Sequence, residues 1–214
     1  MRYAEWCIAA PSLEADIAAA AMGLDDIGHS RVLYGSLREL GAPDPGVEEG
    51  IYANVPLLDK PWTDWTGFVA ANAVLDTAFS LMIEALAHGN VEVLRTRLRK
   101  MLQEERYHFL HGRSWLNEVP PSDATARAYR EAVAFFGPDH GDVDQLHEQG
   151  ILASGVEDLR RGLDERIGNQ GGRWMTDWTT WDPIRRRLEP GGIDQATLEL
   201  LQGLAEKRYM PASG

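Results

Sequence analysis

The sequence has little cysteine, little positive charge and no long apolar run, and each shortage excludes a class of protein. Its one cysteine, Cys7, rules out an intrachain disulfide and a cysteine-based zinc site. Lysine and arginine number 21 against 33 aspartate and glutamate residues, and the net charge of -12 argues against a nucleic-acid partner. No stretch reaches the roughly 18 apolar residues of a membrane span, and the first residues show no apolar signal-peptide region. We therefore expect a cytoplasmic protein that binds neither membrane nor nucleic acid.

The sequence contains enough apolar side chains for one packed domain. Of its 214 residues, 44% are hydrophobic and 25% are charged, and no low-complexity linker interrupts them. Sustained period-2 alternation, typical of strands, is absent. We therefore predict one all-α domain over residues 1–214, with a helical bundle through residue 118 and additional C-terminal helices. The expected helices cover residues 13–40, 65–87, 91–118, 123–136, a segment after Ser154, and 194–207, with the tail of another helix at 2–9 and a loop at 42–62.

Residues that favour helix starts mark several of these segments. Ser12 stands where the first long helix would begin and is suited to accept the hydrogen bond of an N-cap. Ser154 and Glu157 form the Ser-x-x-Glu pattern of a capping box. Asp182 followed by Pro183 is typical of an N-cap and the first helical residue, which predicts a further helix start.

Polar residues interrupt the apolar stripe of each of the three long helices. Residues three or four apart lie on one helix face, and each stripe has carboxylates, amides or histidines near its middle. Burying an unpaired carboxylate is costly or shifts its pKa, so these groups need partners. The stripes are Met22, Asp26, His29 and Leu33; Val69, Asn72, Asp76, Phe79 and Ile83; and Leu98, Met101, Glu105, His108 and Trp115.

Two of the stripes carry a carboxylate three residues before a histidine. Asp26 precedes His29 in this way, and Glu105 precedes His108, so each pair shares one helix face. Helix-bundle di-iron proteins use two such motifs together with one carboxylate from each of the other two helices. The pattern therefore predicts a metal cluster in the bundle core. A single carboxylate-x-x-His pair more often makes an internal hydrogen bond or caps a helix, and that interpretation stays open for either motif alone.

One of the two additional carboxylates is present and the other is not. Asp76 lies 13 residues before the Gly89 turn and Glu105 lies 16 after it, so they reach similar heights on neighbouring helices. On the side of the first long helix, Glu5 falls roughly 13 Å short of the height of Asp26. We therefore count five candidate metal ligands rather than six. They are Asp26, His29, Asp76, Glu105 and His108.

Six segments of the sequence form a pattern that is specific when taken together. They are Glu5-Trp6-Cys7, Ala10-Pro11-Ser12-Leu13-Glu14, Leu24-Asp25-Asp26-Ile27-Gly28-His29-Ser30-Arg31, Leu75-Asp76-Thr77-Ala78, Glu104-Glu105-Arg106-Tyr107-His108 and Leu146-His147-Glu148-Gln149-Gly150-Ile151. This pattern resembles the ferritin-like subunits of the bacterial phenylacetyl-CoA 1,2-epoxidase complex. The resemblance covers most of the chain and is weakest at 42–60 and after residue 168.

The resemblance implies a ferritin-like four-helix bundle with a di-iron centre. In that family the centre activates O2 and inserts one oxygen atom into the aromatic ring of a CoA thioester. By the same resemblance Glu105 and Asp26 would bridge or clasp the two ions, His29 and His108 would each hold one, and Asp76 would be terminal. The sequence has no dinucleotide-binding glycine motif and no cysteine cluster, so an external reductase is implied.

The family has a catalytic subunit and a structural partner that has lost iron ligands, and the sequence resembles each in part. Glu5-Trp6-Cys7 resembles the structural subunit, whereas Asp25-Asp26-Ile27-Gly28-His29 resembles the Asp-Glu-x-Gly-His motif of the catalytic one. We predict a di-iron oxygenase subunit that acts on an aromatic acyl-CoA or similar substrate. The alternative is a non-catalytic scaffold that docks a catalytic homologue, and a metal-storage or peroxide-handling bundle ranks third. The expected partner is a homologous ferritin-like subunit or a second copy in a homodimer.

Two features outside the cluster have two interpretations each. The run Arg185-Arg186-Arg187 either grips the phosphates of CoA or forms a solvated helix face. His111, three residues after His108, either supports the cluster or is a hydrogen-bonded surface histidine.

Overall fold

Helices build the fold, and a single isolated β-bridge occurs among the described residues. The structure is a computed structural model that describes residues 2–42, 54–120, 122–170 and 176–208. The central helical segments are α1 (Leu13–Glu39), α2 (Trp65–Ala70), the π-helical segment η3 (Ala71–Leu75), α3 (Asp76–Ala87), α4 (Glu92–Glu118) and α5 (Asp123–Phe136). The remaining elements are η1 (Tyr3–Trp6), η2 (Pro56–Leu58), α6 (Asp142–Glu148), α7 (Val156–Ile167), η4 (Trp178–Thr180) and α8 (Gln195–Arg208). The predicted all-α, ferritin-like fold with additional C-terminal helices is confirmed.

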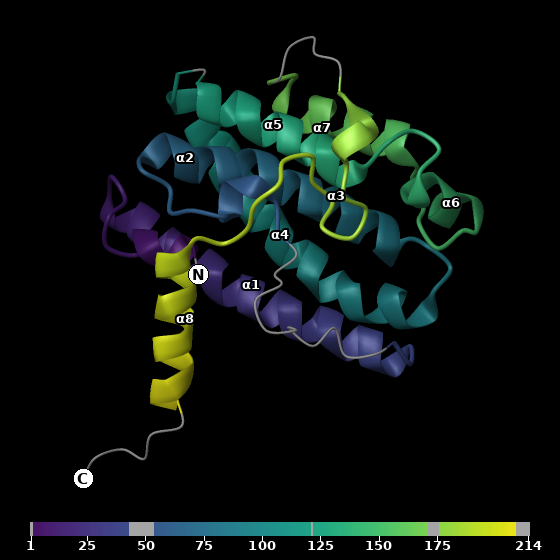
Figure 1. The fold of residues 1–214 in the computed structure, drawn as a ribbon, viewed down its shortest axis with the longest axis horizontal. Coiled ribbons are helices and arrows are strands. Elements are labelled where there is room, and N and C mark those ends of the chain that lie inside the picture. Colours follow the sequence, from purple (N-terminus) through teal and green to yellow (C-terminus); the bar gives the residue numbers. More distant parts are fainter. Residues whose placement is uncertain (1, 43–53, 121, 171–175, 209–214) are drawn as a thin grey trace.

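The run α2–η3–α3 lies in the middle of the molecule. Figure 1 shows α1 and α4 on one side of this run and α5 and α7 on the other. Helix α4 packs against α1, η3 and α3, while α5 packs against α2, η3 and α3. The N-terminal turn η1 packs against α1. Helices α1 and α4, which carry four of the candidate ligands, therefore lie on one side of the central run, and α3 within that run carries the fifth.

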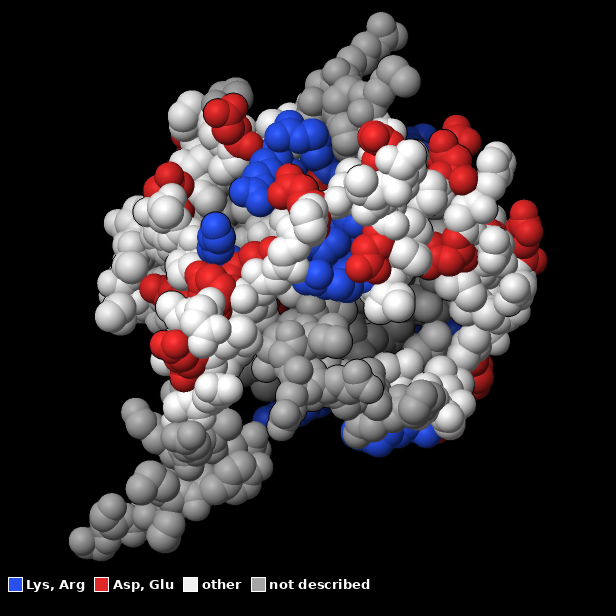
Figure 2. All heavy atoms as spheres, viewed as in Figure 1, with Lys and Arg blue, Asp and Glu red and all other residues white. Residues whose placement is uncertain are grey.

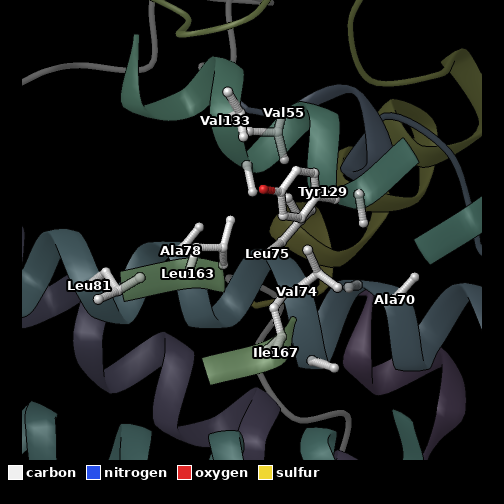
Figure 3. Close-up of a cluster of buried hydrophobic side chains, with 14 of the residues drawn as sticks. Val55, Ala70, Val74, Leu75, Ala78, Leu81, Tyr129, Val133, Leu163 and Ile167 are labelled. Atoms are coloured by element: carbon white, nitrogen blue, oxygen red, sulfur yellow. The ribbon is translucent and has the colours of Figure 1, made fainter. Parts of the chain in front are cut away.

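The central run is apolar because it is buried on both sides. Side chains from this run, α5 and α7 form a continuous core, in which Val74, Leu75 and Leu163 are at most 1% exposed (Figure 3). Contrary to the expectation from the sequence, Trp65–Ala87 is long and apolar enough to cross a membrane, with a mean hydropathy of 1.4 over its most apolar stretch. However, 72% of that stretch is buried inside the protein. Its hydrophobicity is thus explained by the core of the bundle.

The predicted helix starts have different outcomes. The Ser12 N-cap is confirmed, because its side chain accepts a hydrogen bond from the Ala15 N–H at 3.2 Å. The capping box at Ser154 is wrong, since α7 begins one residue later and its N-cap is Gly155. The Val156 N–H instead donates to Asp144 Oδ1 of α6 at 2.8 Å. A carboxylate from another helix takes the place of the local cap.

Two other local predictions are also wrong. Asp182 does not begin a helix: its Oδ1 accepts from the N–H groups of Ile184 and Arg185 at 2.9 and 3.0 Å, which closes a turn. The β-bridge to Arg187 then fixes that turn. Residues 2–9 do not form the end of an α-helix, because only the 3-10 turn η1 is present there.

A buried hydrogen-bond network connects the N-terminal turn with residues late in the sequence. Arg187 makes two bonds to the carboxylate of Asp59, at 2.6 and 3.1 Å, and is 2% exposed. Arg2 donates to the backbone oxygen of Asp59 at 3.1 Å and to Thr197 Oγ1 at 3.0 Å. Removing one partner would leave a buried charge unpaired, which is strongly destabilising. The network therefore fixes the N-terminal turn, including Tyr3, against the body of the protein.

Helix α4 approaches the π-helical segment η3 through a glycine, and this gives a stability prediction. A Cβ atom on Gly112 would lie 2.8 Å from the Cα and 2.9 Å from the N of Ala73. Because these are backbone atoms, the helices would have to separate, and we expect Gly112→Ala to destabilise the protein by about 1–3 kcal/mol. Urea unfolding of the metal-free protein measures this change.

The matched control for this substitution is Gly28→Ala on α1. A Cβ atom at Gly28 would have no neighbour within 4 Å. Since alanine is the better helix former, this variant should be neutral or more stable by up to about 1 kcal/mol. Equal unfolding free energies for the two variants would contradict the close approach of α4 to η3.

Candidate metal centre

The structure brings all five predicted ligands together. Asp26 and His29 come from α1, Asp76 from the first residue of α3, and Glu105 and His108 from α4. Two groups of three arise, in each of which one ligand atom per residue lies within 4.8 Å of the others. One group is Asp26, Asp76 and His108, and the other is Asp26, His29 and Glu105. The two groups share Asp26, so they form one cluster with two neighbouring candidate metal positions.

Each imidazole of the cluster has one nitrogen that faces a carboxylate of the predicted ligand set. We call these ligand-set carboxylates the inner carboxylates. His29 Nδ1 lies 3.0 Å from Glu105 Oε1, and His108 Nδ1 lies 3.1 Å from Asp76 Oδ2. The two rings are 6.0 Å apart between centroids. Both histidines are buried, with exposed fractions of 7% and 1%. The ring nitrogens that could bind a metal therefore point into the protein, toward the carboxylates.

The other nitrogen of each ring contacts a carboxylate of the opposite helix that is not in the predicted ligand set, here called an outer carboxylate. His29 Nε2 lies 3.0 Å from Glu104 Oε2, and His108 Nε2 lies 3.4 Å from Asp25 Oδ2. Each outer carboxylate immediately precedes an inner one in the sequence, so the two motifs support each other across the helix pair. A carboxylate in this position fixes the orientation and tautomer of a metal-binding histidine. Sequence reasoning missed both outer residues, although the paired acids Asp25-Asp26 and Glu104-Glu105 were a usable signal.

Neutral side chains hold the inner carboxylates Asp76 and Glu105. Asp76 Oδ2 accepts hydrogen bonds from Tyr3 Oη at 3.2 Å and from Asn72 Nδ2 at 3.4 Å. Glu105 Oε2 accepts from Ser80 Oγ at 2.5 Å. These three donors were not predicted as part of the site, because they lie far from the two motifs in the sequence.

Burial and mutual repulsion change the acidities of the carboxylates. Burial, together with the nearby charge of Asp76, raises the pKa of Asp26 from 3.8 to about 7. Burial also raises the pKa of Asp76, against the opposing effect of its contact with His108. The cluster therefore holds more protons near neutral pH than isolated carboxylates would.

The carboxylates in turn change the acidities of the histidines. Burial lowers the pKa of His108, but the hydrogen bond to Asp76 and the surrounding carboxylates outweigh it and raise this pKa to about 9. The pKa of His29 is also raised, because its contacts with Glu105 and Glu104 outweigh burial. Without a metal, the His108 imidazolium thus balances part of the carboxylate charge, and the raised pKa of His29 favours its charged form as well. Two divalent cations would replace these protons.

The π-helical segment η3 connects the two sides of the site. Its Asn72 is fully buried, donates to the backbone oxygen of His108 at 3.3 Å and accepts from His111 Nδ1 at 2.8 Å. Single π-helical turns inside α-helices occur frequently at functional sites. His111 therefore reaches the cluster through Asn72, which favours the first of its two interpretations.

A cavity of about 410 Å³ lies against one side of the cluster. Glu105 and Ser80 form part of its wall, so it reaches the carboxylate that Ser80 holds. Its other lining residues are Thr77, Glu84, Leu102, Arg106, Phe109, Leu110 and Arg166. This mixture of apolar and charged side chains is compatible with a ligand that has both an apolar and an anionic part.

The arginine run Arg185-Arg186-Arg187 lies in a turn and not on a helix face. Arg186 donates to the backbone oxygens of Phe135 and Phe136, at 2.6 and 3.0 Å. Arg187 is paired with Asp59 as described above. Figure 2 shows acidic and basic side chains interspersed on the visible face of the protein. Two of the three arginines are thus engaged in internal contacts.

The donor set fits iron in type. Three carboxylates and two imidazoles are the ligands of di-iron bundle proteins, in which oxygen and nitrogen donors leave positions open for other molecules. The arrangement also supplies the orientation of both histidines. The usual set has six ligands, whereas the two groups found in the described part of the chain contain five.

Comparison with known proteins gives a family match and a relative. The family model for phenylacetic acid catabolic proteins matches residues 1–172. The chain is also 27% identical over 165 residues to one of the subunits that make up the 1,2-phenylacetyl-CoA epoxidase of Escherichia coli (strain K12). That alignment covers 70% of this chain and 66% of the relative, slightly less than two thirds of its length.

Proposed function

Because the chain belongs to the phenylacetic acid catabolic protein family, we propose that it is a subunit of a non-haem di-iron oxygenase. The oxygenase would insert oxygen from O2 into an aromatic acyl-CoA or a similar substrate. The observation that carries this proposal is the convergence of two ligand groups on a shared carboxylate, Asp26. The name of the E. coli relative supports phenylacetyl-CoA as the first substrate to test.

Each ligand group would hold one iron ion. Asp76 and His108 would hold the first, His29 and Glu105 the second, and Asp26 would lie between them. Bound iron would supply the activation of O2 and the redox chemistry of oxygen insertion. Glu104 and Asp25 would keep the imidazoles oriented, and Ser80 would keep Glu105 oriented.

The cavity beside Glu105 is the proposed substrate-binding site. It joins the cluster through Glu105 and Ser80, and Leu102 and Phe109 offer apolar contacts for an aromatic group. Because the sequence has one cysteine and no dinucleotide-binding motif, electrons would come from an external reductase. The similarity to a catabolic enzyme supports a cytoplasmic location.

The alternative function is a non-catalytic structural subunit that docks a catalytic di-iron homologue. It is supported by the count of five rather than six candidate ligands among the described residues, and by an exposed apolar stripe on α1. This stripe comprises Leu13, Ile17, Leu24 and Ile27, with exposed fractions of 69, 61, 70 and 48%. Contiguous exposed apolar surface of this kind marks interaction sites. A homologous ferritin-like subunit, or a second copy of the chain, is therefore the proposed partner in either case.

Iron analysis and O2 consumption separate the two functions. The full-length protein is produced with iron supplied, purified, and assayed with phenylacetyl-CoA and a chemical or protein reductant. About two iron ions per chain and substrate-dependent O2 consumption support the oxygenase. Metal-free protein that consumes no O2 but forms a stable complex with a catalytic homologue supports the structural role instead.

A further inference from the structure

We propose that Tyr3 is a positioning residue of the metal centre, whose hydroxyl holds the Asp76 carboxylate in place for metal binding. The inference rests on the proposed di-iron function, because it assigns a role in assembling that site. On this side of the cluster, the hydrogen bond to Asp76 comes from the N-terminal turn rather than from α1, α3 or α4. There the turn contributes a phenol to the site.

The ring of Tyr3 is held firmly beside the cluster. Its Cβ would lie 3.3 Å from a Cβ placed on Gly23, so the turn packs closely on α1, one helical turn before Asp26. The ring makes edge contacts with Trp62 and Phe68, at centroid distances of 5.8 and 5.3 Å. The whole residue is 7% exposed. With the ring fixed on both sides, the direction of the hydroxyl is fixed as well.

The neighbouring residue reinforces this placement. Arg2 is anchored by the buried network through Asp59 and Thr197. The N-terminal turn is fixed at Arg2 and packed at Tyr3. It therefore loses little further conformational freedom when the Tyr3 hydroxyl bonds to Asp76. The hydrogen bond is therefore preorganised, as the support of a binding site needs to be.

The hydroxyl bonds to the same oxygen that faces His108. Tyr3 Oη lies 3.2 Å from Asp76 Oδ2, and His108 Nδ1 lies 3.1 Å from that atom. When His108 binds a metal through Nδ1, it can no longer donate to Asp76. Among the described residues, Tyr3 and Asn72 are then the donors that remain on this oxygen, and Tyr3 makes the shorter contact. The phenol would thus keep the Asp76 carboxylate oriented when Nδ1 of His108 is bound to a metal instead of to Asp76.

The test compares Tyr3→Phe with Tyr129→Phe. Tyr129 is a matched control, since it is also buried and its hydroxyl also bonds to a carboxylate, that of Asp164, away from the cluster. Metal-free full-length protein is titrated with Co²⁺ alone, and the visible spectrum and binding constant are recorded. We expect Tyr3→Phe to weaken binding by about 10–100-fold and to change the Co²⁺ spectrum, as for other lost supports of metal ligands. Tyr129→Phe should bind Co²⁺ like the wild type.

A double-mutant cycle excludes a merely structural effect. If Tyr3 acts through Asp76, Tyr3→Phe should cause no further loss of Co²⁺ binding in a protein that already carries Asp76→Asn. Additive losses, or equal losses from Tyr3→Phe and Tyr129→Phe, would overturn the proposal. So would a visible phenolate-to-iron absorption in the ferric protein that Tyr3→Phe removes, because Tyr3 would then be a ligand.

The outcomes also separate this inference from the proposed function. Wild-type protein that binds Co²⁺ and iron while Tyr3→Phe binds them equally well would overturn the role of Tyr3 alone. Wild-type protein that binds neither metal would overturn the di-iron proposal and the role of Tyr3 together.

Discussion

Asp26→Asn should abolish binding at both metal positions and, at the same time, stabilise the metal-free protein. Asp26 is shared by the two ligand groups, so its charge is lost from both. We expect the iron content to fall from about two ions per chain to almost none. Elemental analysis of protein purified with iron supplied measures the loss.

The stabilisation follows from the pKa of Asp26, which is raised from 3.8 in the unfolded chain to about 7 in the folded one. A group with a raised pKa contributes stability below its unfolded pKa, and that contribution is lost as the pH rises through the folded pKa. Wild-type metal-free protein should therefore lose stability between about pH 4 and pH 8, whereas Asp26→Asn keeps it. The expected advantage of the variant is about 2–4 kcal/mol at pH 8, at about 1.4 kcal/mol per pKa unit.

Urea unfolding at pH 5 and pH 8 in the presence of a chelator measures this difference. Asp158→Asn, at an exposed position on α7, is the control and should change neither metal content nor the pH dependence. A variant Asp26→Asn that is less stable than the wild type at pH 8 would mean that the carboxylate is held by favourable contacts. In that case the repulsion among the cluster carboxylates would not be the dominant effect.

His108→Ala should abolish metal uptake and leave the fold largely intact. In the proposed centre His108 would supply a nitrogen ligand, and its Nδ1 contacts Asp76, so its loss would remove one donor and release the carboxylate beside it. Its side chain is almost fully buried, and truncation costs some stability through the cavity that it leaves. The far-ultraviolet circular dichroism spectrum should nevertheless match that of the wild type, because the core on the other side of α3 is unchanged.

His88→Ala is the matched control, since His88 lies at the C-terminal end of α3 and outside the cluster. Iron content and Co²⁺ titration should be affected in His108→Ala and unaffected in His88→Ala. Unchanged iron in well-folded His108→Ala would count decisively against a metal centre at this place. What would remain is a buried network of carboxylates and histidines.

The sequence was sufficient to predict which ligands meet, because that depends on helix geometry. The spacing of Asp26 and His29, and of Glu105 and His108, fixes a shared helix face. The Gly89 turn fixes the relative height of Asp76 and Glu105, and the structure brings the five residues together. Metal binding by these five residues is the prediction that the experiments above test.

The remainder of the site depends on contacts between residues far apart in the sequence. Tyr3 and Ser80 are ordinary side chains in their own segments, and only the packed structure places them on Asp76 and Glu105. The π-helical turn that positions Asn72 has no distinctive sequence pattern. The false helix starts at Ser154 and Asp182 have the same origin, because a distant carboxylate or a local turn satisfies the backbone there.

The crossed contacts of the two histidines have a consequence for assembly. His29 takes its outer carboxylate from α4, and His108 takes its own from α1. Neither helix can therefore preorganise its imidazole while it is separated from the other. Affinity for the ions should appear only after α1 and α4 have docked, and an ion that bridges them would oppose their separation. Bound metal ions would hold α1 and α4 together. Tight metal binding would therefore indicate that the tertiary structure has formed correctly.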